Sequence, residues 1–403
     1  MDKLYFKFTF NRIYSKGYLY IIKKICKYVL MFLCCIIFFP VSLILHFLKF
    51  RVVNIFSERI GHLVIESACL LIDDNAKQFK FIILRKKNIS NDYFFSLLNF
   101  YFILINNRVL VWLLDSMTLF KFILLFDCNK YERELLFPKL SFGLLGNKSN
   151  LDSIINVPNY DIIYLDNYLR SIGLSDNDWY VCIHSREEGF SIVDDYIQSH
   201  RNSDIHNYKS AINYVSSLGG WIIRLGDSSM NDIKFNNNKL VDYALSNSKN
   251  QMLDVLLCKS AKFILGSTSG ICTLGCVLGT PCAITNLMPT GHGWYTKFDF
   301  FITKKIFSLH LNRFLSLFEM MSLPVSNFRY KFQYDESGYI CIENTPEEIL
   351  CLTIDMINFL NNNYQISDDQ KNINNLISSY RVINSNASYS NANFSLSFYC
   401  NLI

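Results

Sequence analysis

The feature that most constrains the fold is an alternation of short apolar segments with helix-like segments from about residue 179 onward. Four segments have the continuous apolar character of buried strands: residues 179–184, 221–225, 262–265 and 281–285. Helix-like segments separate them, including residues 252–259 and a helix that Ser203 or Asp204 would cap. Strands that alternate with helices form parallel sheets with helices on both faces. The sequence therefore predicts an α/β fold.

Polar stretches follow three of these strands directly. They are His184-Ser185-Arg186-Glu187, Arg224-Leu225-Gly226-Asp227 and Ser267-Thr268-Ser269-Gly270. In open parallel sheets, ligands bind outside the carboxyl ends of the strands. The three stretches are therefore expected to share one site.

The stretch after Gly266 indicates what that site binds. Ser267 to Gly270 would open the helix predicted over residues 271–278. Free N–H groups and the positive end of the helix dipole favour an anion such as a phosphate. An ordinary Ser/Thr N-cap is the alternative. Arg186 and Arg224 at neighbouring strand ends favour the phosphate, because arginine binds phosphate through two parallel hydrogen bonds.

An apolar run near the N-terminus predicts membrane association. Residues 29–48 contain no full charge, and they are long enough to just span a bilayer. Lys23, Lys24 and Lys27 precede the run, Lys49 and Arg51 follow it, and Pro40 interrupts it. Positive charge on both flanks favours a bent or shallow segment with both ends on the cytoplasmic side; a single-pass helix is the alternative. A chain beginning near Lys49 is expected to leave the membrane and keep its fold.

Composition narrows the class of protein. The chain has 403 residues, of which 51% are hydrophobic and 18% charged, enough for two domains with sizeable cores. A net charge of +5 is too small to indicate nucleic-acid binding. The 13 cysteines include no CxxC pair, which favours reduced, buried thiols over a metal or disulfide framework.

Weaker motifs allow two interpretations each. Asp176-Asn177-Asp178 matches a metal-binding DxD pattern, but it precedes its strand, and a solvated turn is the other interpretation. His292 either contacts substrate or is a loop histidine without a role. No GxGxxG or GxxxxGK[ST] motif supports a dinucleotide or Walker-type site. The Asn- and Ser-rich sequence after residue 361 predicts a surface helix and a loosely ordered tail.

Several ordered motifs together resemble a family of bacterial glycosyltransferases encoded with surface-polysaccharide genes. They are RIGHL near residue 60, CIHSREEGF, RNSDIHNYKSAINYVSSLGGWIIRLGD, VDYALSNSKNQMLDVLL and FILGSTSGICTLGCVLGTPCAITN. The match covers most of residues 51–305, and weakly residues 393–396. More distantly, the His-x-Arg and Gly-Ser-Thr-Ser elements are similar to those of fucosyltransferase-type enzymes with the GT-B fold.

The resemblance implies a GT-B-like architecture, in which two Rossmann-type doubly wound domains face a cleft. Residues 1–50 would be the basic, hydrophobic, membrane-associated segment. Residues 51–168 would form the acceptor domain and residues 169–335 the nucleotide-sugar domain. Residues 336–403 would form the C-terminal helix and the Asn/Ser-rich tail.

The resemblance and the strand-end pattern together give candidate site residues. The donor contacts would be His184, Arg186, Arg224, Asp227, Asp242, Asp254, Ser267, Thr268, Ser269 and Gly270. Arg59 and Gly61 would belong to the acceptor loop. Glu66, His62 and Glu187 are the candidates for the catalytic base, and the sequence does not choose among them. Ala68 stands where the family pattern carries an acid. No metal or cofactor is expected.

The implied activity is sugar transfer from a nucleotide-sugar donor to a glycan acceptor, carried on a lipid, in surface-polysaccharide synthesis. Arginines and a helix N-terminus would stabilise the leaving diphosphate without a metal, and a base would activate the acceptor hydroxyl with inversion. The expected location is the cytoplasmic face of the inner membrane. The alternatives are a non-catalytic membrane-associated polysaccharide-binding protein and a sugar-nucleotide epimerase.

Overall fold

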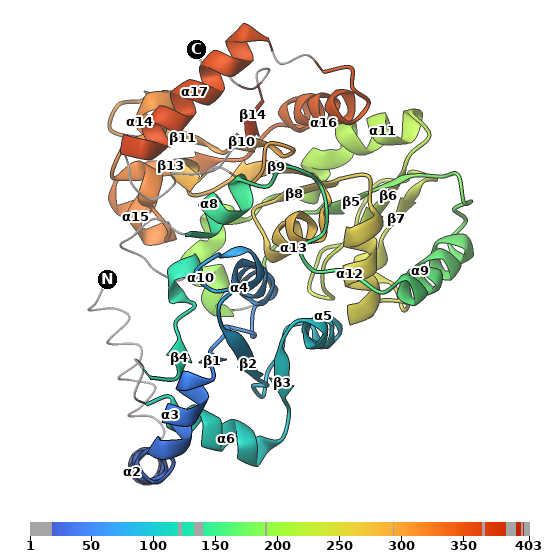
Figure 1. The fold of residues 1–403 in the computed structure, drawn as a ribbon. Coiled ribbons are helices and arrows are strands. Elements are labelled where there is room, and N and C mark those ends of the chain that lie inside the picture. Colours follow the sequence, from blue (N-terminus) through green and yellow to red (C-terminus); the bar gives the residue numbers. More distant parts are fainter. Residues whose placement is uncertain are drawn as a thin grey trace. The chain divides into compact units, whose positions relative to one another are not determined.

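A computed structural model of the chain describes residues 18–119, 123–132, 140–189, 192–292, 294–364, 367–383, 392–395 and 398 (Figure 1). Its internal contacts divide the chain into two compact units. The smaller unit comprises residues 1–55, 74–87 and 99–128, and the larger unit comprises residues 56–73, 88–98 and 129–403. The domain boundaries at residues 168 and 335 stay predictions.

The smaller unit is built on a four-stranded, all-parallel sheet in the order β3-β2-β1-β4. The strands are β1 (Phe50–Val53), β2 (Lys80–Leu84), β3 (Ile103–Ile105) and β4 (Leu125–Phe126). This order is the one that begins a doubly wound sheet. Among the described residues, the helices of this unit are α2 (Tyr18–Ile37), α3 (Phe39–Phe47) and α6 (Arg108–Met117).

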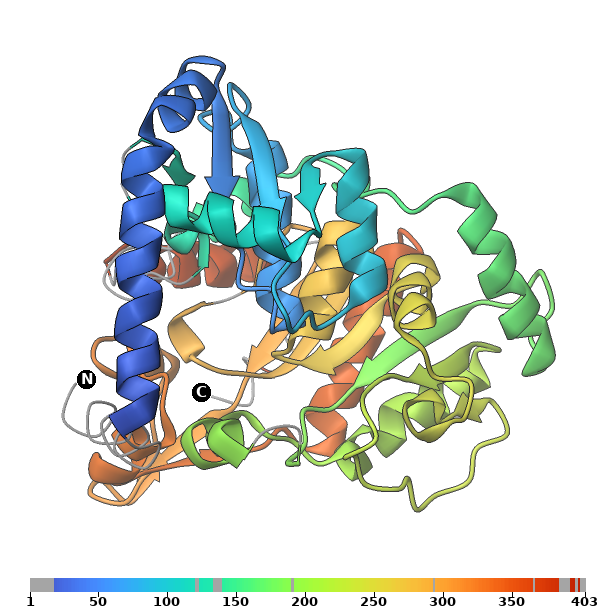
Figure 2. The same cartoon turned by 90° about the horizontal axis from the view of Figure 1, so that it is seen from below.

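The N-terminal helices are part of this unit's core. Phe38 and Leu45 pack against a buried cluster formed by Val52, Ile82, Met117 and Leu124. Helix α2 packs against α6, which crosses it, as Figure 2 shows. Among the described residues no single helix is long and apolar enough to cross a membrane. Helices α2 and α3, bent by 60° between Ile37 and Phe39, pass that test only as a pair, by length and composition.

The larger unit is built on a seven-stranded, all-parallel sheet in the order β14-β10-β9-β8-β5-β6-β7. The strands are β5 (Tyr180–His184), β6 (Trp221–Arg224), β7 (Leu240–Val241), β8 (Ile264–Ser267), β9 (Cys282–Leu287), β10 (Phe300–Thr303) and β14 (Asn393–Phe394). From β7 to β10 this is the doubly wound order 3-2-1-4-5-6. The predicted α/β class is confirmed, and each predicted strand in this region matches one within a few residues.

Helices cover both faces of the larger sheet (Figure 1). Helices α11 (Lys209–Ser217) and α16 (Pro346–Leu360) pack together on one face, and α12 (Gln251–Ser260) and α13 (Gly270–Leu278) pack together on the other. Helix α4 (Ile60–Ile72) lies against α13. The remaining elements are α5 (Asp92–Leu97), α7 (Asn129–Glu132), α8 (Leu140–Gly146), α9 (Asn159–Ser171), α10 (Ile192–Gln198), α14 (Leu317–Met321), α15 (Lys331–Glu336), α17 (Asp368–Ile383), and an antiparallel sheet of β11 (Lys305–Ser308), β12 (Arg313–Phe314) and β13 (Tyr339–Ile342).

The C-terminal region corrects one expectation. The Asn/Ser-rich sequence predicts a loosely ordered tail, but Asn393 and Phe394 pair with Phe300 and Phe301 and extend the sheet as β14. The Phe394 side chain is fully buried, and Gln370 of α17 hydrogen-bonds its carbonyl oxygen. Of the predicted tail, residues 384–391, 396–397 and 399–403 lie outside the described residues.

Candidate functional site

The larger unit contains a pocket of about 710 Å³ at the carboxyl ends of β5 and β8. These two strands are neighbours, and the strand order runs in opposite directions from them. Such a reversal opens a crevice that binds ligands in doubly wound sheets. The residues that line the pocket include His62, His184, Arg186, Thr268, Ser269 and Gly270, six of the residues expected from the sequence.

Two helix N-termini meet at this pocket. A Cβ atom added to Gly270, the first residue of α13, would lie 2.7 Å from the backbone nitrogen of Gly61 in α4. Neither N-cap residue, Arg59 or Ser269, makes a side-chain capping hydrogen bond. Within the described chain, no protein group accepts from the N–H groups of Gly61 or Gly270. Two sets of free N–H donors and two helix dipoles therefore favour an anion here.

At the C-terminal end of α13 the backbone groups are hydrogen-bonded within the protein. The contrast with its N-terminal end supports a ligand there. Gly279 ends the helix with φ of 86°, in the left-handed region. The carbonyl oxygen of Leu278 accepts from the Ser153 hydroxyl at 2.6 Å and from Lys259 Nζ at 3.0 Å. The helix thus has its C-terminal groups satisfied by the protein, whereas its N-terminal groups face the pocket.

Two arginines stand beside the N-terminus of α13. Arg186 donates from its backbone N–H to the Ser267 hydroxyl at 2.8 Å and from Nη1 to the Gln198 carbonyl at 2.8 Å. Arg201 donates from Nη2 to the Thr268 carbonyl at 2.8 Å. Both arginines line the pocket. Arg201 was not expected from the sequence, because it lies in a short 3-10 turn (Ser199–Arg201) and not at a strand end.

Arg224 corrects the sequence-based expectation. Its side chain is fully buried and pairs with Glu187 Oε1 at 2.7 Å and Asp242 Oδ2 at 2.9 Å. It also donates to the Asn231 carbonyl at 2.7 Å, and neither Arg224 nor Asp242 lines the pocket. The guanidinium is therefore occupied inside the protein and is not available to a diphosphate in this structure.

Glu187 lines the pocket but is poorly placed to act as a base. Its Oε2 accepts from the backbone N–H of Asn231 at 2.8 Å, and its Oε1 accepts from Arg224. The side chain is only 6% exposed. Because both oxygens are occupied, Glu187 holds Arg224 and the loop around Asn231 in place.

The three residues of the Ser267–Ser269 stretch differ in role. Ser267 is fully buried, and its hydroxyl joins the end of β8 to Arg186 instead of facing the pocket. Thr268 contributes its carbonyl oxygen to Arg201, and its hydroxyl accepts weakly from the Met288 N–H at 3.4 Å. Ser269 occupies the N-cap position, but among the described residues its hydroxyl hydrogen-bonds only the Cys272 thiol, at 3.7 Å. The N-cap alternative is therefore not seen for Ser269.

The remaining donor candidates lie at the rim or in the wall of the pocket. His184 is buried, and its Nδ1 lies 3.1 Å from the Leu225 carbonyl oxygen. Burial lowers the pKa of His184 to about 4, so the ring is neutral at pH 7. Asp227 accepts from Ser229 N–H at 2.8 Å, and Asp254 pairs with Lys249 at 2.8 Å. Burial raises the pKa of Asp254. His184, Asp227 and Asp254 all line the pocket.

On α4, His62 and Glu66 form a pair one helical turn apart. His62 lines the pocket, and its Nδ1 lies 3.2 Å from Glu66 Oε1. Glu66 is fully buried, and its Oε2 accepts from the Phe56 N–H at 3.0 Å. A carboxylate that accepts from Nδ1–H leaves Nε2 unprotonated in the neutral ring. Glu66 is therefore placed to orient His62, which faces the pocket.

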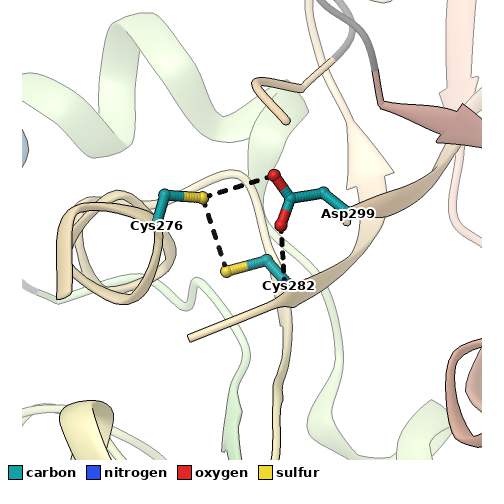
Figure 3. Close-up of side chains that lie close together, drawn as sticks. All are labelled: Cys276, Cys282 and Asp299. Carbon is teal, nitrogen blue, oxygen red and sulfur yellow. Dashed lines mark hydrogen bonds between the residues drawn. The ribbon is translucent and has the colours of Figure 1, made fainter. Parts of the chain in front are cut away.

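Two further motifs of the sequence lie elsewhere. Asp178 accepts from Ser175 in a turn before β5, and Asp176 pairs with Arg170 on the surface. His292 does line the pocket, and its ring packs edge-on to Phe142. Cys276, Cys282 and Asp299 meet in the interior at the far end of α13 (Figure 3).

The cysteine–aspartate cluster is explained by hydrogen bonds within the protein. Asp299 Oδ1 accepts from the Cys282 N–H at 2.8 Å (Figure 3). Its Oδ2 accepts from the Thr296 N–H at 2.9 Å and hydroxyl at 2.8 Å. The Cys276 sulfur accepts from the Trp294 indole at 3.0 Å. Burial raises the pKa of Asp299 to about 6 and that of both thiols. These atoms join β9, α13 and the loop before β10, and we assign no ligand to them.

Comparisons with known proteins identify no family. No protein-family model matches the sequence, and no curated protein matches it. Among solved structures, a glycosyl transferase family 9 protein from Veillonella parvula shares 11% identity at a TM-score of 0.37, over 59% of this chain and 80% of that one. The ADP-heptose LPS heptosyltransferase II of E. coli shares 11% identity at a TM-score of 0.35, over 59% of this chain and 84% of that one. An E. coli heptosyltransferase solved with ADP shares 10% identity at a TM-score of 0.33, over 63% of this chain and 90% of that one.

Similarity at these scores supports neither a fold class nor a function. The fold class therefore rests on the strand orders described above, and the proposed function rests on the geometry of the pocket. The expected likeness to fucosyltransferase-type enzymes stays a prediction.

Proposed function

We propose that the protein is a glycosyltransferase that moves a sugar from a nucleotide-sugar donor to a glycan or lipid-linked acceptor in surface-polysaccharide synthesis. The observation that carries the proposal is the meeting of two uncapped helix N-termini, at Gly61 and Gly270, beside Arg186 and Arg201. Such an arrangement suits the diphosphate of a nucleotide sugar, which carries two negative charges close together.

The leaving diphosphate gains negative charge as the glycosidic bond breaks. Arg186, Arg201 and the N–H groups of Gly270 and Gly61 are placed to stabilise that charge from fixed positions, which lowers the barrier without reorganisation. This arrangement and the location of Asp176 and Asp178 before β5 lead us to propose transfer without a metal. Activity is then expected to survive EDTA, and a loss that Mn²⁺ or Mg²⁺ restores would contradict this part of the proposal.

The acceptor hydroxyl must lose a proton as it attacks the sugar. His62 is the base that the geometry supports, because it faces the pocket while buried Glu66 holds its Nδ1. Nε2 would accept the proton, and Glu66 would stabilise the resulting imidazolium. Attack opposite to the leaving diphosphate would invert the anomeric configuration.

The donor site is tested by calorimetry with a panel of nucleotide sugars and nucleoside diphosphates. Arg186→Ala and Arg201→Ala should each weaken binding by about ten- to a hundredfold, since a charge-assisted contact contributes about 1.5–3 kcal/mol. Arg170→Ala removes an arginine outside the pocket, 54% exposed, and should change nothing. Unchanged affinity in both folded pocket variants would contradict the donor site.

The chemistry is tested separately with the same donor and membrane glycolipid extracts as acceptor. His62→Ala should reduce transfer by about 10²–10⁴-fold and leave donor affinity unchanged. Glu66→Gln should reduce transfer less, because His62 keeps a hydrogen-bond partner. A wild-type protein that binds donor but turns nothing over would support the binding-protein alternative. Release of an epimerised nucleotide sugar without acceptor would support the epimerase.

A further inference from the structure

Helix α2 carries a continuous apolar face that no described residue covers. The exposed side chains on this face are Ile22 at 41%, Ile25 at 57%, Val29 at 54%, Phe32 at 52%, Leu33 at 49% and Ile36 at 51%. Their spacing of three and four residues places them on one side of the helix. A stripe of this length exposes far more apolar surface than scattered single side chains do, which marks an interaction surface.

The other side of α2 is fixed to the smaller unit. Met31 and Cys35 are 5% and 1% exposed, and α2 packs against α6 (Figure 2). At the bend, Phe38 joins the core under the sheet. The apolar face is therefore the outer side of a helix that the protein holds in place from within.

Three lysines lie in the N-terminal half of the helix. Lys23, Lys24 and Lys27 are exposed, and by helical spacing none falls on the apolar face. Toward the end of the helix, exposed Leu30 and Ile37 widen the apolar surface. An exposed apolar surface beside a group of lysines is typical of helices that lie in the plane of an anionic membrane. A helix that spans a bilayer would instead be apolar on all sides over about 20 residues.

We propose that α2 docks the protein in the headgroup region of one leaflet of an anionic phospholipid bilayer, with its axis in the membrane plane. The 60° bend before α3 and the stripe that α2 buries against α6 both suit a helix that stays on one side of the bilayer. The inference does not depend on the proposed transferase activity, and its test reads lipid binding alone.

The test is flotation of the purified full-length protein with phosphatidylcholine vesicles, with and without phosphatidylglycerol. The protein should float with the anionic vesicles. Phe32→Glu with Ile36→Glu should reduce the bound fraction at least about tenfold, because two half-buried apolar side chains leave the lipid. Lys23, Lys24 and Lys27 changed together to Gln should weaken binding about fivefold per lysine. This second variant leaves the apolar contacts intact and serves if the first fails to fold.

The matched control changes two exposed apolar side chains on another helix. Tyr160→Glu with Ile163→Glu on α9, where the exposures are 68% and 61%, should bind as the wild type does. Equal loss in the control would contradict a specific docking face. A wild type that ignores both vesicles and forms a dimer, which the α2 variant splits, would assign the face to a second copy instead. An N-terminal tag protected from protease by the vesicles would show a spanning helix and overturn the in-plane proposal.

Discussion

Helices α2 in the smaller unit and α13 in the larger unit are both rich in apolar residues, yet they lie in opposite surroundings. Seven of the nine residues of α13 are buried, between the sheet and the neighbouring helices. Among the described side chains of α2, only Met31 and Cys35 are buried. An apolar composition predicts that a helix contacts an apolar surface. It does not predict whether that surface belongs to the protein or lies outside it.

The two sheets also differ in how deeply their strands are buried. In the larger unit, every residue of β5, β8, β9 and β10 is buried, as expected for parallel strands with helices on both faces. In the smaller unit, none of the four described strands is buried throughout: β1 and β2 are buried in part, and β3 and β4 contain no buried residue. Phe38 and α3 supply part of this sheet's cover.

The largest expected effect follows from removing that cover. A chain that begins at Lys49 should lose the folded smaller unit, since Phe38 and Leu45 belong to its core and α2 covers α6. This prediction differs from the sequence-based expectation that such a chain keeps its fold. Limited proteolysis should cut within residues 50–55, 74–87 and 99–128 and spare β5 to β10. Equal protease resistance in both units would contradict the dependence of the smaller unit on its N-terminal helices.

The second prediction probes the interior of the larger unit. Arg224→Ala should lower the free energy of unfolding by about 3–5 kcal/mol, because it leaves buried Glu187 and partly exposed Asp242 without their cation. Urea denaturation measures the change. Arg186→Ala, at the pocket surface, should lower stability much less and affect donor binding instead. Similar stability losses in the two variants would contradict the different placement of these arginines.

Local pattern was enough to predict the larger sheet but not the smaller one. Strands such as β5 and β8 have sharp polar ends, so each segment could be bounded in the sequence. Residues 94–126 are apolar almost throughout, and nothing marks where β3, α6 and β4 begin. Strand β14 has two residues in an Asn/Ser-rich stretch, and only its pairing with β10 defines it.

The pocket shows the same limit. Arg186, Ser269 and Gly270 were predictable because they follow strands and open a helix. Arg224 also ends a strand, but position in the chain does not reveal that its side chain runs into the interior toward Asp242. Arg201 and the contact between Gly61 and Gly270 join segments far apart in the sequence, and they arise only from tertiary packing.

The third prediction tests how tightly α4 and α13 meet. Gly270→Ala places a Cβ 2.5 Å from Ile60 Cγ2 and 2.7 Å from the Gly61 nitrogen, so the helices must separate. We expect a loss of about 1–3 kcal/mol in unfolding free energy, typical of overpacking, together with weaker donor binding. Gly61→Ala, with 3.2 Å to the nearest atom, should have a smaller effect. Leu33→Ala on the exposed face of α2 is the contrasting control, and a loss there equal to that of Gly270→Ala would argue against the difference in packing.

The last prediction concerns a titration in the interior of the larger unit. His200 is 7% exposed, packs against the Tyr334 ring at 5.0 Å, and has no hydrogen-bond partner for either ring nitrogen in the described chain. Burial and nearby cations lower the pKa of His200 to about 3. The folded protein therefore keeps the ring neutral, whereas the unfolded chain takes up a proton below about pH 6.5. Stability from this group is present above that pH and falls by about 1.4 kcal/mol per pH unit as the pH decreases toward 3.

His200→Phe keeps an aromatic ring and removes the titration. The variant should match the wild type near pH 7 and lose less stability between pH 6.5 and 4, as urea denaturation at stepped pH would show. The difference between the two profiles isolates His200, because His184 and Asp299, with pKa values of about 4 and 6, titrate in both proteins. Equal dependence of the unfolding free energy on pH in the two proteins would contradict the lowered pKa of His200. It would mean that water reaches the His200 ring in the folded protein.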